Sequence, residues 1–340
     1  MKAGKYDRIL LAHGGGGQLS QQLLYDSILP SLGNDILSQL ADSAILDFAG
    51  HSLCFTTDSY VVKPLFFNGG DIGKLAVCGT INDLAVAGAR PIALSLSLVI
   101  EEGLEMELLQ RILSSVAAAA QANGVKVVTG DTKTVEAGAA DRIFVNTAGL
   151  GEKLAAADLR MERIKPGDRI IINGTIGDHG MTIISQREGI KFESDLVSDC
   201  AAVAPLTMEL LEHAGAEIKF MRDPTRGGLA ATLNEIAVGT GLGIEIRESA
   251  IPVKPTVRAA ADMLGFDVLS IANEGKFVAV VSGDSAQKCV EICRAHPLGK
   301  DAGIIGEVIA ADVPTVEMVT AIGGRRMIQM PYGRELPRIC

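Results

Sequence analysis

Three aspartates in the first half of the chain stand where carboxylates could hold a metal ion. Asp58 and Asp131 each follow an apolar segment that predicts a strand, and Asp83 falls inside a predicted helix over 71–87. Aspartate is unfavourable inside a helix, so Asp83 requires another reason. Carboxylates gathered from separate elements commonly bind the Mg2+ that accompanies nucleotide phosphates. A solvated turn or cap is the commoner role for a single aspartate, but the three, with Lys133 close to Asp131, together favour such a site.

The most specific pattern in the chain is Arg222-Asp-Pro-Thr-Arg-Gly-Gly228. Asp223 precedes a proline, which favours an extended conformation, and the two glycines open a predicted helix over 228–238. Free N–H groups at a helix start favour an anion such as a phosphate, and Arg222 and Arg226 add positive charge. An ordinary helix start explains the proline, but it does not explain two arginines and two glycines together.

The last ten residues, 331–340, end on a cysteine. Two prolines and a glycine exclude a helix or a central strand, so we expect an extended, mobile arm. A thiol at the tip of such an arm could carry a covalently attached group from one site to another. We expect Arg334 and Arg338 to favour the thiolate of Cys340, against the effect of its own carboxylate. A disordered terminus with an incidental cysteine is the ordinary alternative.

Other candidates are weaker. The glycine run at 14–17 lacks the ending of a P-loop, so a hinge is as good an interpretation as a phosphate cradle. Asn273-Glu-Gly275 precedes a predicted strand, and a hairpin turn also explains it. Cys289 and Cys293 could share a helix face with His296, but no fourth zinc ligand is evident and core packing is favoured. His179, in a glycine-rich turn, is a modest functional candidate.

Composition limits the classes of protein to consider. A length of 340 residues predicts about two domains, and the 48% of hydrophobic residues can fill two cores. The formal charge of −10 argues against nonspecific binding to nucleic acid or to anionic lipid. The sequence has neither a segment suited to cross a membrane nor a signal-peptide pattern. Six scattered cysteines do not indicate a disulfide framework, so a reducing cytoplasm is expected.

The elements that must position these residues are predicted to alternate between strands and helices. A charged segment at 152–168, with the turn signal Lys165-Pro-Gly-Asp168, separates two halves of similar layout. We therefore predict an α+β fold with two α/β domains, over 1–155 and 156–330, and a tail over 331–340. The predicted strands are 44–48, 52–57, 92–100, 125–128, 143–151, 169–174, 243–247, 277–281, 303–309, 315–319 and 326–330. The predicted helices are 71–87, 104–120, 199–214, 228–238, 255–264 and 284–295.

Five short motifs, in this order and at this chain length, resemble one known family. They are Thr57-Asp-Ser59, Asn82-Asp-Leu-Ala85, Gly130-Asp-Thr-Lys133, Asp223-Pro-Thr-Arg-Gly-Gly228 and Asn273-Glu-Gly275. The set resembles the ATP-dependent superfamily of aminoimidazole ribonucleotide synthetase (PurM) and selenophosphate synthetase. The ending Pro337-Arg-Ile-Cys340 resembles the signature tail of one branch, the HypE hydrogenase maturation factors. The resemblance covers nearly the whole chain.

The resemblance implies a fold and a site. It implies two PurM-like domains, a homodimer formed by the N-terminal domains, and a cleft for ATP and Mg2+. The implied metal ligands are Asp58, Asp83, Asp131 and Asp223. The implied nucleotide-binding residues include Asn82, Thr225, Gly227 and Gly228. Cys340, Lys133 and Glu274 are the implied catalytic residues, with Lys133 near the γ-phosphate and Glu274 as a base.

The resemblance also implies a reaction. Cys340 would receive a carbamoyl group from the carbamoyltransferase HypF, and ATP would drive dehydration of the thiocarbamate to a thiocyanate. The cyano group would pass to iron on a HypC–HypD complex for [NiFe]-hydrogenase. One alternative is another superfamily enzyme such as a selenophosphate synthetase, whose glycine-rich N-terminal region usually carries a reactive cysteine; here the cysteine nearest to residues 14–17 is Cys54. The other is a non-catalytic scaffold that binds ATP and iron.

Overall fold

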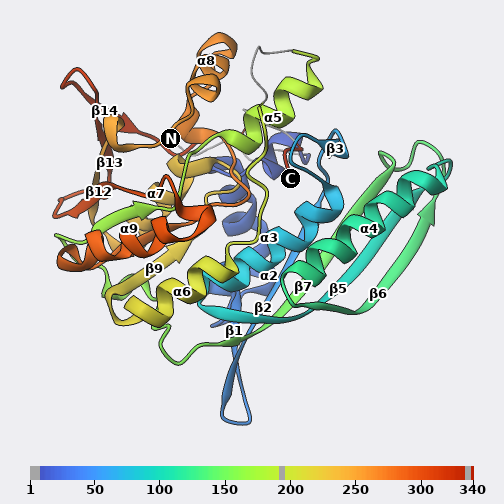
Figure 1. Ribbon diagram of the computed structural model, residues 1–340, viewed down its shortest axis with the longest axis horizontal. Coiled ribbons are helices and arrows are strands. Elements are labelled where there is room, and N and C mark those ends of the chain that lie inside the picture. The colour runs from blue at the N-terminus through green and yellow to red at the C-terminus, as the bar shows by residue number, and fades with distance from the viewer. Residues whose placement is uncertain (1–7, 191–195, 334–337) are drawn as a thin grey trace.

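The computed structural model describes residues 8–190, 196–333 and 338–340, and its strands form two separate large sheets (Figure 1). The first sheet has the strand order β1 (Ala44–Phe48), β2 (His51–Tyr60), β7 (Ile143–Lys153), β5 (Ala89–Glu101) and β6 (Lys126–Val135). Strands β5 and β6 pair in parallel, and the other neighbours in this sheet pair antiparallel. Because β1 pairs with β2 only as far as Phe55, the rest of β2 has a free edge on that side.

The second sheet has seven strands. Their order is β14 (Arg325–Ile328), β13 (Val316–Val319), β10 (Gly243–Arg247), β12 (Gly303–Ile309), β8 (Arg169–Ile172), β11 (Val278–Val281) and β9 (Ile218–Arg222). Strands β10 and β13 are parallel, and the remaining neighbours are antiparallel. A short hairpin of β3 (Phe66–Phe67) and β4 (Gly70–Asp71) stands apart from both sheets.

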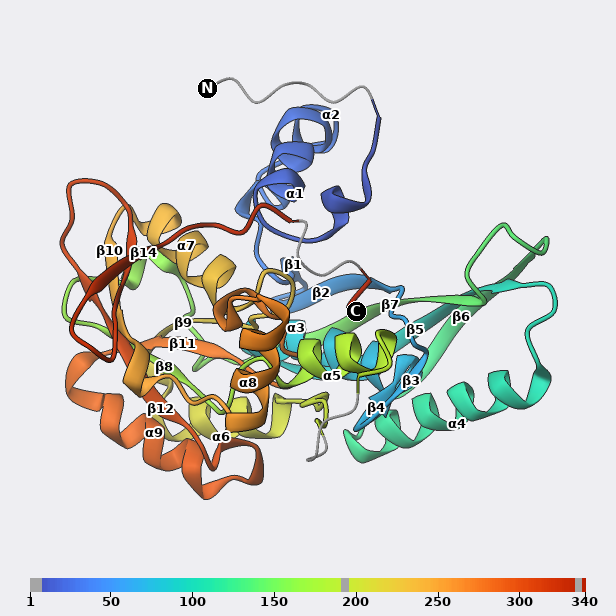
Figure 2. The same cartoon turned by 90° about the horizontal axis from the view of Figure 1, so that it is seen from above.

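Helices α3 (Ile72–Val86) and α4 (Met106–Ala122) cover one face of the first sheet (Figures 1 and 2). The Asp71 side chain starts α3 by accepting hydrogen bonds from the Gly73 N–H (2.8 Å) and the Lys74 N–H (3.2 Å). Ile143 and Val145 of β7 point into the core beneath α3, as the alternation of a strand requires. Helix α3 is buried on nearly all sides, because α6 (Ala204–Ala214) of the second half also packs against it.

Both faces of the second sheet are covered. Ile171 of β8 belongs to the core shared with α6 and α9 (Ala286–Ala295), whereas Ile170 and Ile172 belong to the core shared with α7 (Gly228–Thr240). This explains the uninterrupted isoleucine run, since a strand covered on both faces has no solvent-facing positions. Cys289 and Cys293 are buried in the first of these cores, as expected.

The N-terminal helices α1 (Gln18–Leu23) and α2 (Leu29–Leu32) lie beside the chain leading to the C-terminus and away from α4 (Figure 2). The Gln18 N–H donates to the Pro331 carbonyl at 2.9 Å. Gly17 has φ +77°, and a Cβ there would lie 2.0 Å from the Pro331 oxygen, so a glycine is required. The glycine run thus lets two distant segments approach.

The predicted α+β class is confirmed, and β10, β12 and α8 (Pro255–Leu264) have the predicted bounds. Helix α5 (Asp178–Arg187) was not predicted, because its glycine-rich start resembles a loop. The predictions that Asp58 and Asp131 follow their strands are wrong, since β2 continues through Asp58 to Tyr60 and β6 continues through Asp131 to Val135. All six cysteines are free. Within the described residues, no helix combines the length and apolar character needed to cross a membrane.

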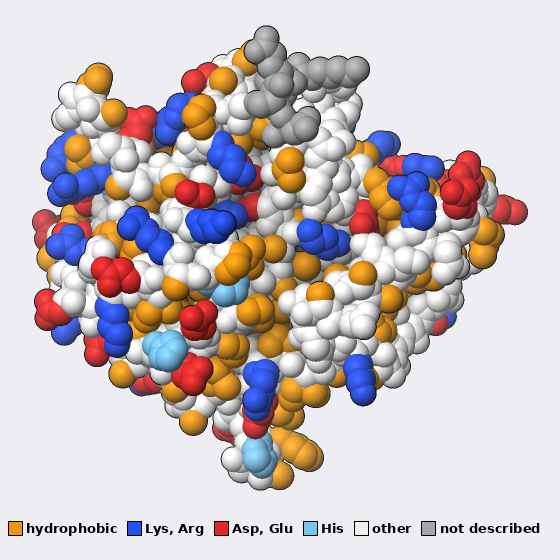
Figure 3. All heavy atoms as spheres, in the orientation of Figure 1, with side chains coloured by type: hydrophobic (Ala, Val, Ile, Leu, Met, Phe, Trp, Pro, Cys, Tyr) orange, Lys and Arg blue, Asp and Glu red, His pale blue; other side chains and the backbone are white. Residues whose placement is uncertain are grey.

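The face seen in Figure 3 carries acidic and basic side chains interspersed with one another. The C-terminus lies beside α5 between the two sheets (Figures 1 and 2).

Candidate functional site

A cavity of about 350 Å³ opens where the free edge of β2 faces the connection between β9 and α7. It collects residues from six stretches of chain that are distant in sequence. These are the glycine run, the segment before and within the β1–β2 hairpin, helix α3, the region from the end of β9 into α7, Glu274, and the C-terminal Cys340. The residues important here are Gly16, Gly17, Asp42, Asp58, Tyr60, Asp83, Arg222, Asp223, Thr225, Arg226, Glu235, Glu274 and Cys340.

Three aspartates form the acidic centre of this cavity. Asp42 precedes β1, Asp83 lies on α3 and Asp223 follows β9, yet one carboxylate oxygen from each lies within 4.8 Å of the other two. Asp58 lines the same cavity, and its Oδ2 accepts a hydrogen bond from the Tyr60 hydroxyl at 3.1 Å. A cluster of hard oxygen donors from separate elements is the ligand chemistry that Mg2+ prefers.

Like charges raise the pKa values within this cluster. Burial raises the pKa of Asp83 well above its ordinary value, and Asp223, Asp58 and Asp42 raise it further. Burial, followed by Asp42 and Asp58, likewise raises the pKa of Asp223, against the influence of Arg222. A divalent cation would remove this repulsion, so the residues present fit a magnesium ion.

The two arginines of the Arg222–Arg226 segment differ in their partners. The Arg222 Nε lies 3.2 Å from the Asp42 carboxylate and 3.2 Å from the Glu235 carboxylate, so its charge is already compensated. Arg226 donates to the Gly14 carbonyl at 3.2 Å. The pKa of Arg226 is raised first by the Cys340 thiol and then by Asp58 and Glu274, which places its charge among these three groups.

Glu274 presents a buried carboxylate without a complete set of partners. It is 2% exposed, and its Oε1 has no hydrogen-bond partner among the described residues. Its backbone is fixed on both sides: the N–H donates to Asp199 Oδ1 at 3.1 Å, and the carbonyl accepts from the Asn82 amide at 3.1 Å. Burial and then Asp223 raise its pKa well above the ordinary value. Such a carboxylate is a stronger base than an exposed one and is available to a ligand.

The C-terminal Cys340 lies in this same cavity. Burial raises the pKa of its thiol strongly, Glu274 adds to the shift, and Arg226 opposes it. The expected influence of Arg338 in favour of the thiolate is therefore not found in the docked position, where Arg226 is the arginine that acts on this thiol. Arg338 points elsewhere, toward the Val61 carbonyl and Asp141, and Arg334 lies outside the described residues.

Comparisons with known proteins agree with these motifs. The AIR synthase related protein families match residues 40–152 with their N-terminal domain and residues 165–319 with their C-terminal domain. A protein of Rhizobium leguminosarum bv. viciae named carbamoyl dehydratase HypE is 49% identical over 333 residues, covering 98% of this chain and 95% of the relative. The chain belongs to the HypE family. Its recognition from five motifs and a tail is thereby confirmed, as is the fold of two AIR synthase-related domains.

Solved HypE structures are similar over most of the chain. A crystal structure of a HypE–HypF complex matches with a TM-score of 0.87 at 46% identity, covering 91% of this chain and 99% of that one. A HypE structure in complex with ATP matches with a TM-score of 0.82 at 44% identity, covering 98% and 100%. The Escherichia coli HypE sequence is 45% identical over 339 residues, covering 98% of this chain and all of the relative.

Six residues predicted from the HypE-type motifs line the cavity. They are Asp58, Asp83, Asp223, Thr225, Glu274 and Cys340. Asn82 is not among the lining residues, because its amide is fully used: it donates to the Ala201 and Glu274 carbonyls and accepts from the Val203 N–H. It joins the two halves and holds Glu274 in place.

Gly227 and Gly228 have a conformational role, and neither is among the described residues that line the cavity. Both have positive φ, +79° and +59°, and a Cβ on Gly228 would lie 2.5 Å from the Ile271 oxygen. These positions require glycine so that α7 can start against the neighbouring loop.

Asp131 and Lys133 are not brought to this cavity by their own chain. They form an exposed ion pair, with the Lys133 Nζ 2.6 Å from an Asp131 oxygen. The register aligns Asp131 with Ser97, then Asn146, then Ser59, whereas Asp58 lies one position along and faces the other side of the sheet. Three strand spacings, about 14 Å, also separate β6 from β2.

Asp42 was missed by the sequence prediction. It stands in Ala41-Asp-Ser43 before a strand, where an aspartate ordinarily caps a turn, and no local pattern distinguishes it. The glycine run was left open between a hinge and a cradle, and Gly16 and Gly17 do line the cavity.

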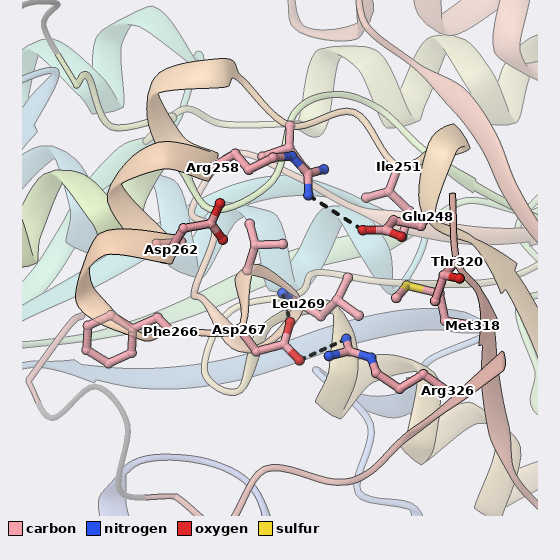
Figure 4. A pocket seen from close by; sticks show the side chains of 13 residues that line it. Glu248, Ile251, Arg258, Asp262, Phe266, Asp267, Leu269, Met318, Thr320 and Arg326 are labelled. Atoms are coloured by element: carbon pink, nitrogen blue, oxygen red, sulfur yellow. Dashed lines mark hydrogen bonds and ion pairs between the residues drawn. The ribbon is translucent and has the colours of Figure 1, made fainter. Parts of the chain in front are cut away.

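A second cavity, of about 290 Å³, lies between α8 and β13 and shares no described lining residue with the first. Arg258 lies 3.8 Å from Glu248, and Arg326 lies 2.9 Å from Asp267 (Figure 4). Because these opposite charges already pair with each other, this cavity has no counterpart of the acidic cluster.

Proposed function

We propose that this chain is an ATP-dependent carbamoyl dehydratase that acts on a carbamoyl group carried by its own Cys340. One observation carries the proposal: the terminal thiol lies in the cavity that holds the acidic cluster, with Glu274 and Arg226 beside it. A substrate attached at this thiol would meet the nucleotide, a base and a cation in one place. The relatives named carbamoyl dehydratase, at 45–49% identity, support the same reaction.

The reaction converts Cys–S–C(=O)–NH2 to Cys–S–C≡N. The amide oxygen attacks the γ-phosphorus of ATP, ADP leaves, and an O-phosphorylated imidate forms. One proton leaves the nitrogen as the imidate forms, and the second leaves as phosphate departs with that oxygen. An amide oxygen is a poor leaving group and a phosphate is a good one, which is why ATP is required. Tethering the carbamoyl group to the chain makes the first step intramolecular.

Each role follows from position. Asp42, Asp83 and Asp223, with Asp58 beside them, would hold Mg2+, whose charge would neutralise the transferred phosphate. Glu274 accepts a proton from the nitrogen, because its buried carboxylate has a raised pKa and an unpaired oxygen. Arg226 faces the thiol end of the same space.

The homodimer is the second part of the proposal. Strand β6 is exposed along nearly its whole length and pairs with a neighbour on one side alone among the described strands. Exposed Phe55 and Val128 add apolar surface to this sheet. An unpaired edge and exposed apolar side chains fit a second copy of the chain. In such a dimer, Asp131 and Lys133 act in the site of the opposite subunit.

Mixed dimers test this arrangement. One subunit carries Lys133→Ala with Cys340 intact, and the other carries Cys340→Ala with Lys133 intact. If Lys133 acts across the interface, the mixed dimer dehydrates its single carbamoyl group while both parent homodimers fail. An inactive mixed dimer would place Lys133 in the site of its own subunit, and an active Lys133→Ala homodimer would place it outside the reaction.

We further propose that HypF loads Cys340 and that a HypC–HypD complex receives the cyano group, in the cytoplasm. The solved HypE–HypF complex supports the first partner. The deciding experiment is intact-mass spectrometry of the chain after incubation with HypF and carbamoyl phosphate, then with Mg2+-ATP. We expect one carbamoyl group on Cys340 and then the loss of one water. ATP binding with no turnover, even when the tail is loaded, would instead favour the non-catalytic ATP-binding scaffold.

A further inference from the structure

The last three residues are held by a defined set of contacts. The Val61 N–H donates to the Cys340 carbonyl oxygen at 3.0 Å, and the Lys63 N–H donates to the Arg338 carbonyl at 3.4 Å. These two bonds align the tail with the segment that follows β2. They bind backbone groups, so they fix its direction and register and leave the side chains to other partners.

His179 holds the middle residue of the tail. It lies in α5, fully buried, with Nε2 2.8 Å from the Ile339 carbonyl and Nδ1 2.8 Å from the Ser198 hydroxyl. Because the Ser198 oxygen already accepts from the Cys200 N–H, its proton is free for Nδ1. The imidazole therefore carries its proton on Nε2 and donates it to the tail. The Ile339 side chain is itself buried in the main core.

Arginines hold the outer end. Arg187 of α5 donates to the Arg338 carbonyl at 2.7 Å and to the Lys63 carbonyl at 2.8 Å. Arg338 donates to the Val61 carbonyl at 2.9 Å and pairs with Asp141 at 2.5 Å. The contacts that involve Arg338 require the tail to be docked, whereas the bond from Arg187 to the Lys63 carbonyl keeps Arg187 in place beside it.

We propose that α5 and the segment 61–63 form a binding site for an extended C-terminal peptide of the type Arg-Ile-Cys. Asp141 binds the cationic side chain of Arg338, and the core binds the branched aliphatic side chain of Ile339. The Val61 N–H binds the terminal carboxyl group. His179 and Arg187 are its positioning residues. They hold the thiol beside Arg226 and Glu274 without touching the reacting group.

Releasing the tail breaks these contacts, so the site sets the balance between a docked and a free Cys340. The binding site stands on the contacts alone. Its consequence for dehydration rests on the proposed function. Two measurements on the full-length chain separate the binding site from the reaction.

The first measurement is the rate at which iodoacetamide alkylates Cys340, read by mass spectrometry of the tail peptide. The other five cysteines are buried and report on folding. Losing the arginine contacts in Arg187→Met or Arg338→Ala should speed alkylation of Cys340 about tenfold or more, and His179→Leu about fivefold. His179→Gln keeps a donor and should stay close to the parent chain.

Arg325→Met is the matched control, because it removes exposed ion pairs to Glu245 and Glu317 on the second sheet. If Arg187→Met and Arg338→Ala alkylate at the parent rate while the other cysteines stay protected, the binding site is wrong. Should His179→Leu expose the other cysteines, the two arginine variants still decide the question.

The second measurement is single-turnover dehydration of chains already loaded on Cys340. We expect the rate to fall in Arg187→Met and Arg338→Ala while loading by HypF stays equal or becomes faster. Faster alkylation with an unchanged dehydration rate would refute the positioning role. If the loaded parent chain never loses water, the proposed function is refuted. The alkylation rates would still test the binding site independently.

Discussion

Replacing Asp83 by asparagine tests the acidic cluster most directly. Two charged carboxylate oxygens no more than 4.8 Å apart repel by about 3 kcal/mol or more at an effective dielectric constant of about 20. Asp83 faces both Asp42 and Asp223 at such distances, and protonation relieves part of this repulsion in the metal-free protein. The amide oxygen of the new asparagine can still accept the hydrogen bond that Thr56 donates to Asp83 at 2.8 Å. We therefore expect metal-free Asp83→Asn to be as stable as the parent chain or about 1–2 kcal/mol more stable.

Binding should change in the opposite direction. With Mg2+-ATP at about 100 times its dissociation constant, the ligand stabilises the parent chain by about 2.7 kcal/mol. Loss of one ligand charge should weaken affinity by about 100-fold or more, which leaves about 0.4 kcal/mol. For a chain of this size, the Tm shift on adding Mg2+-ATP should then fall from about 5 °C to about 1 °C.

The assay is thermal unfolding with and without Mg2+-ATP, supported by calorimetric titration. Asp168→Asn is the control: Asp168 is a buried aspartate, 1% exposed, that pairs with Lys219 at 2.6 Å away from the cavity. It should lower stability by about 3 kcal/mol by leaving a buried lysine unpaired, with the ligand-induced shift preserved. An unchanged shift in Asp83→Asn, or a loss of metal-free stability comparable with the control, would refute the cluster as a Mg2+ site.

Four further outcomes are expected. Cys340→Ala should fold and bind ATP normally, yet accept no carbamoyl group by mass spectrometry; loading at another residue would exclude a carrier tail. Glu274→Gln should bind ATP and load, but lose water at least 100-fold more slowly, because an amide cannot take the proton; normal water loss would remove it as the base. Lys133→Ala should load but not consume ATP in single-turnover assays. With a chelator present, stability should fall as pH rises above about 4, because the raised pKa values of Asp223 and Glu274 mean that the folded state binds more protons; Mg2+ should suppress this dependence, and a flat chelated profile would contradict it.

Local sequence patterns predicted many of the helices and strands, because residues within each element mark where it begins and ends. The α8 bounds follow from Pro255 at the start and Gly265 in the left-handed conformation at the end. Helix α5 escaped prediction because its start is Gly177 in the left-handed conformation, followed by Asp178 and a buried His179. Those residues indicate a turn in the sequence, because the partner of the imidazole, the Ile339 carbonyl of the docked tail, is distant in the chain.

The site was predictable only where a motif carried it. Asp58, Asp83 and Asp223 belong to recognisable strings, whereas Asp42 becomes a ligand candidate only when the β1–β2 hairpin brings it to α3. Asp131 was misplaced because strand β6 is longer than its local sequence indicates. A glycine and several polar residues after Val128 indicate a turn, yet pairing with β5 carries the strand on to Val135. Tertiary pairing overrides such local signals, and no single segment encodes it.

The raised pKa of the docked thiol indicates that loading and dehydration would take place at different positions of the tail. In the cavity, burial and Glu274 keep Cys340 protonated, and a protonated thiol is a poor nucleophile toward a carbamoyl donor. Once carbamoylated, the sulfur carries no charge at any accessible pH, and the same dry, acidic surroundings no longer oppose it. Under the proposed function, loading would therefore belong to the released tail and dehydration to the docked one. Exchange between the two positions would then break the contacts of His179 and Arg187 with the tail in every catalytic cycle.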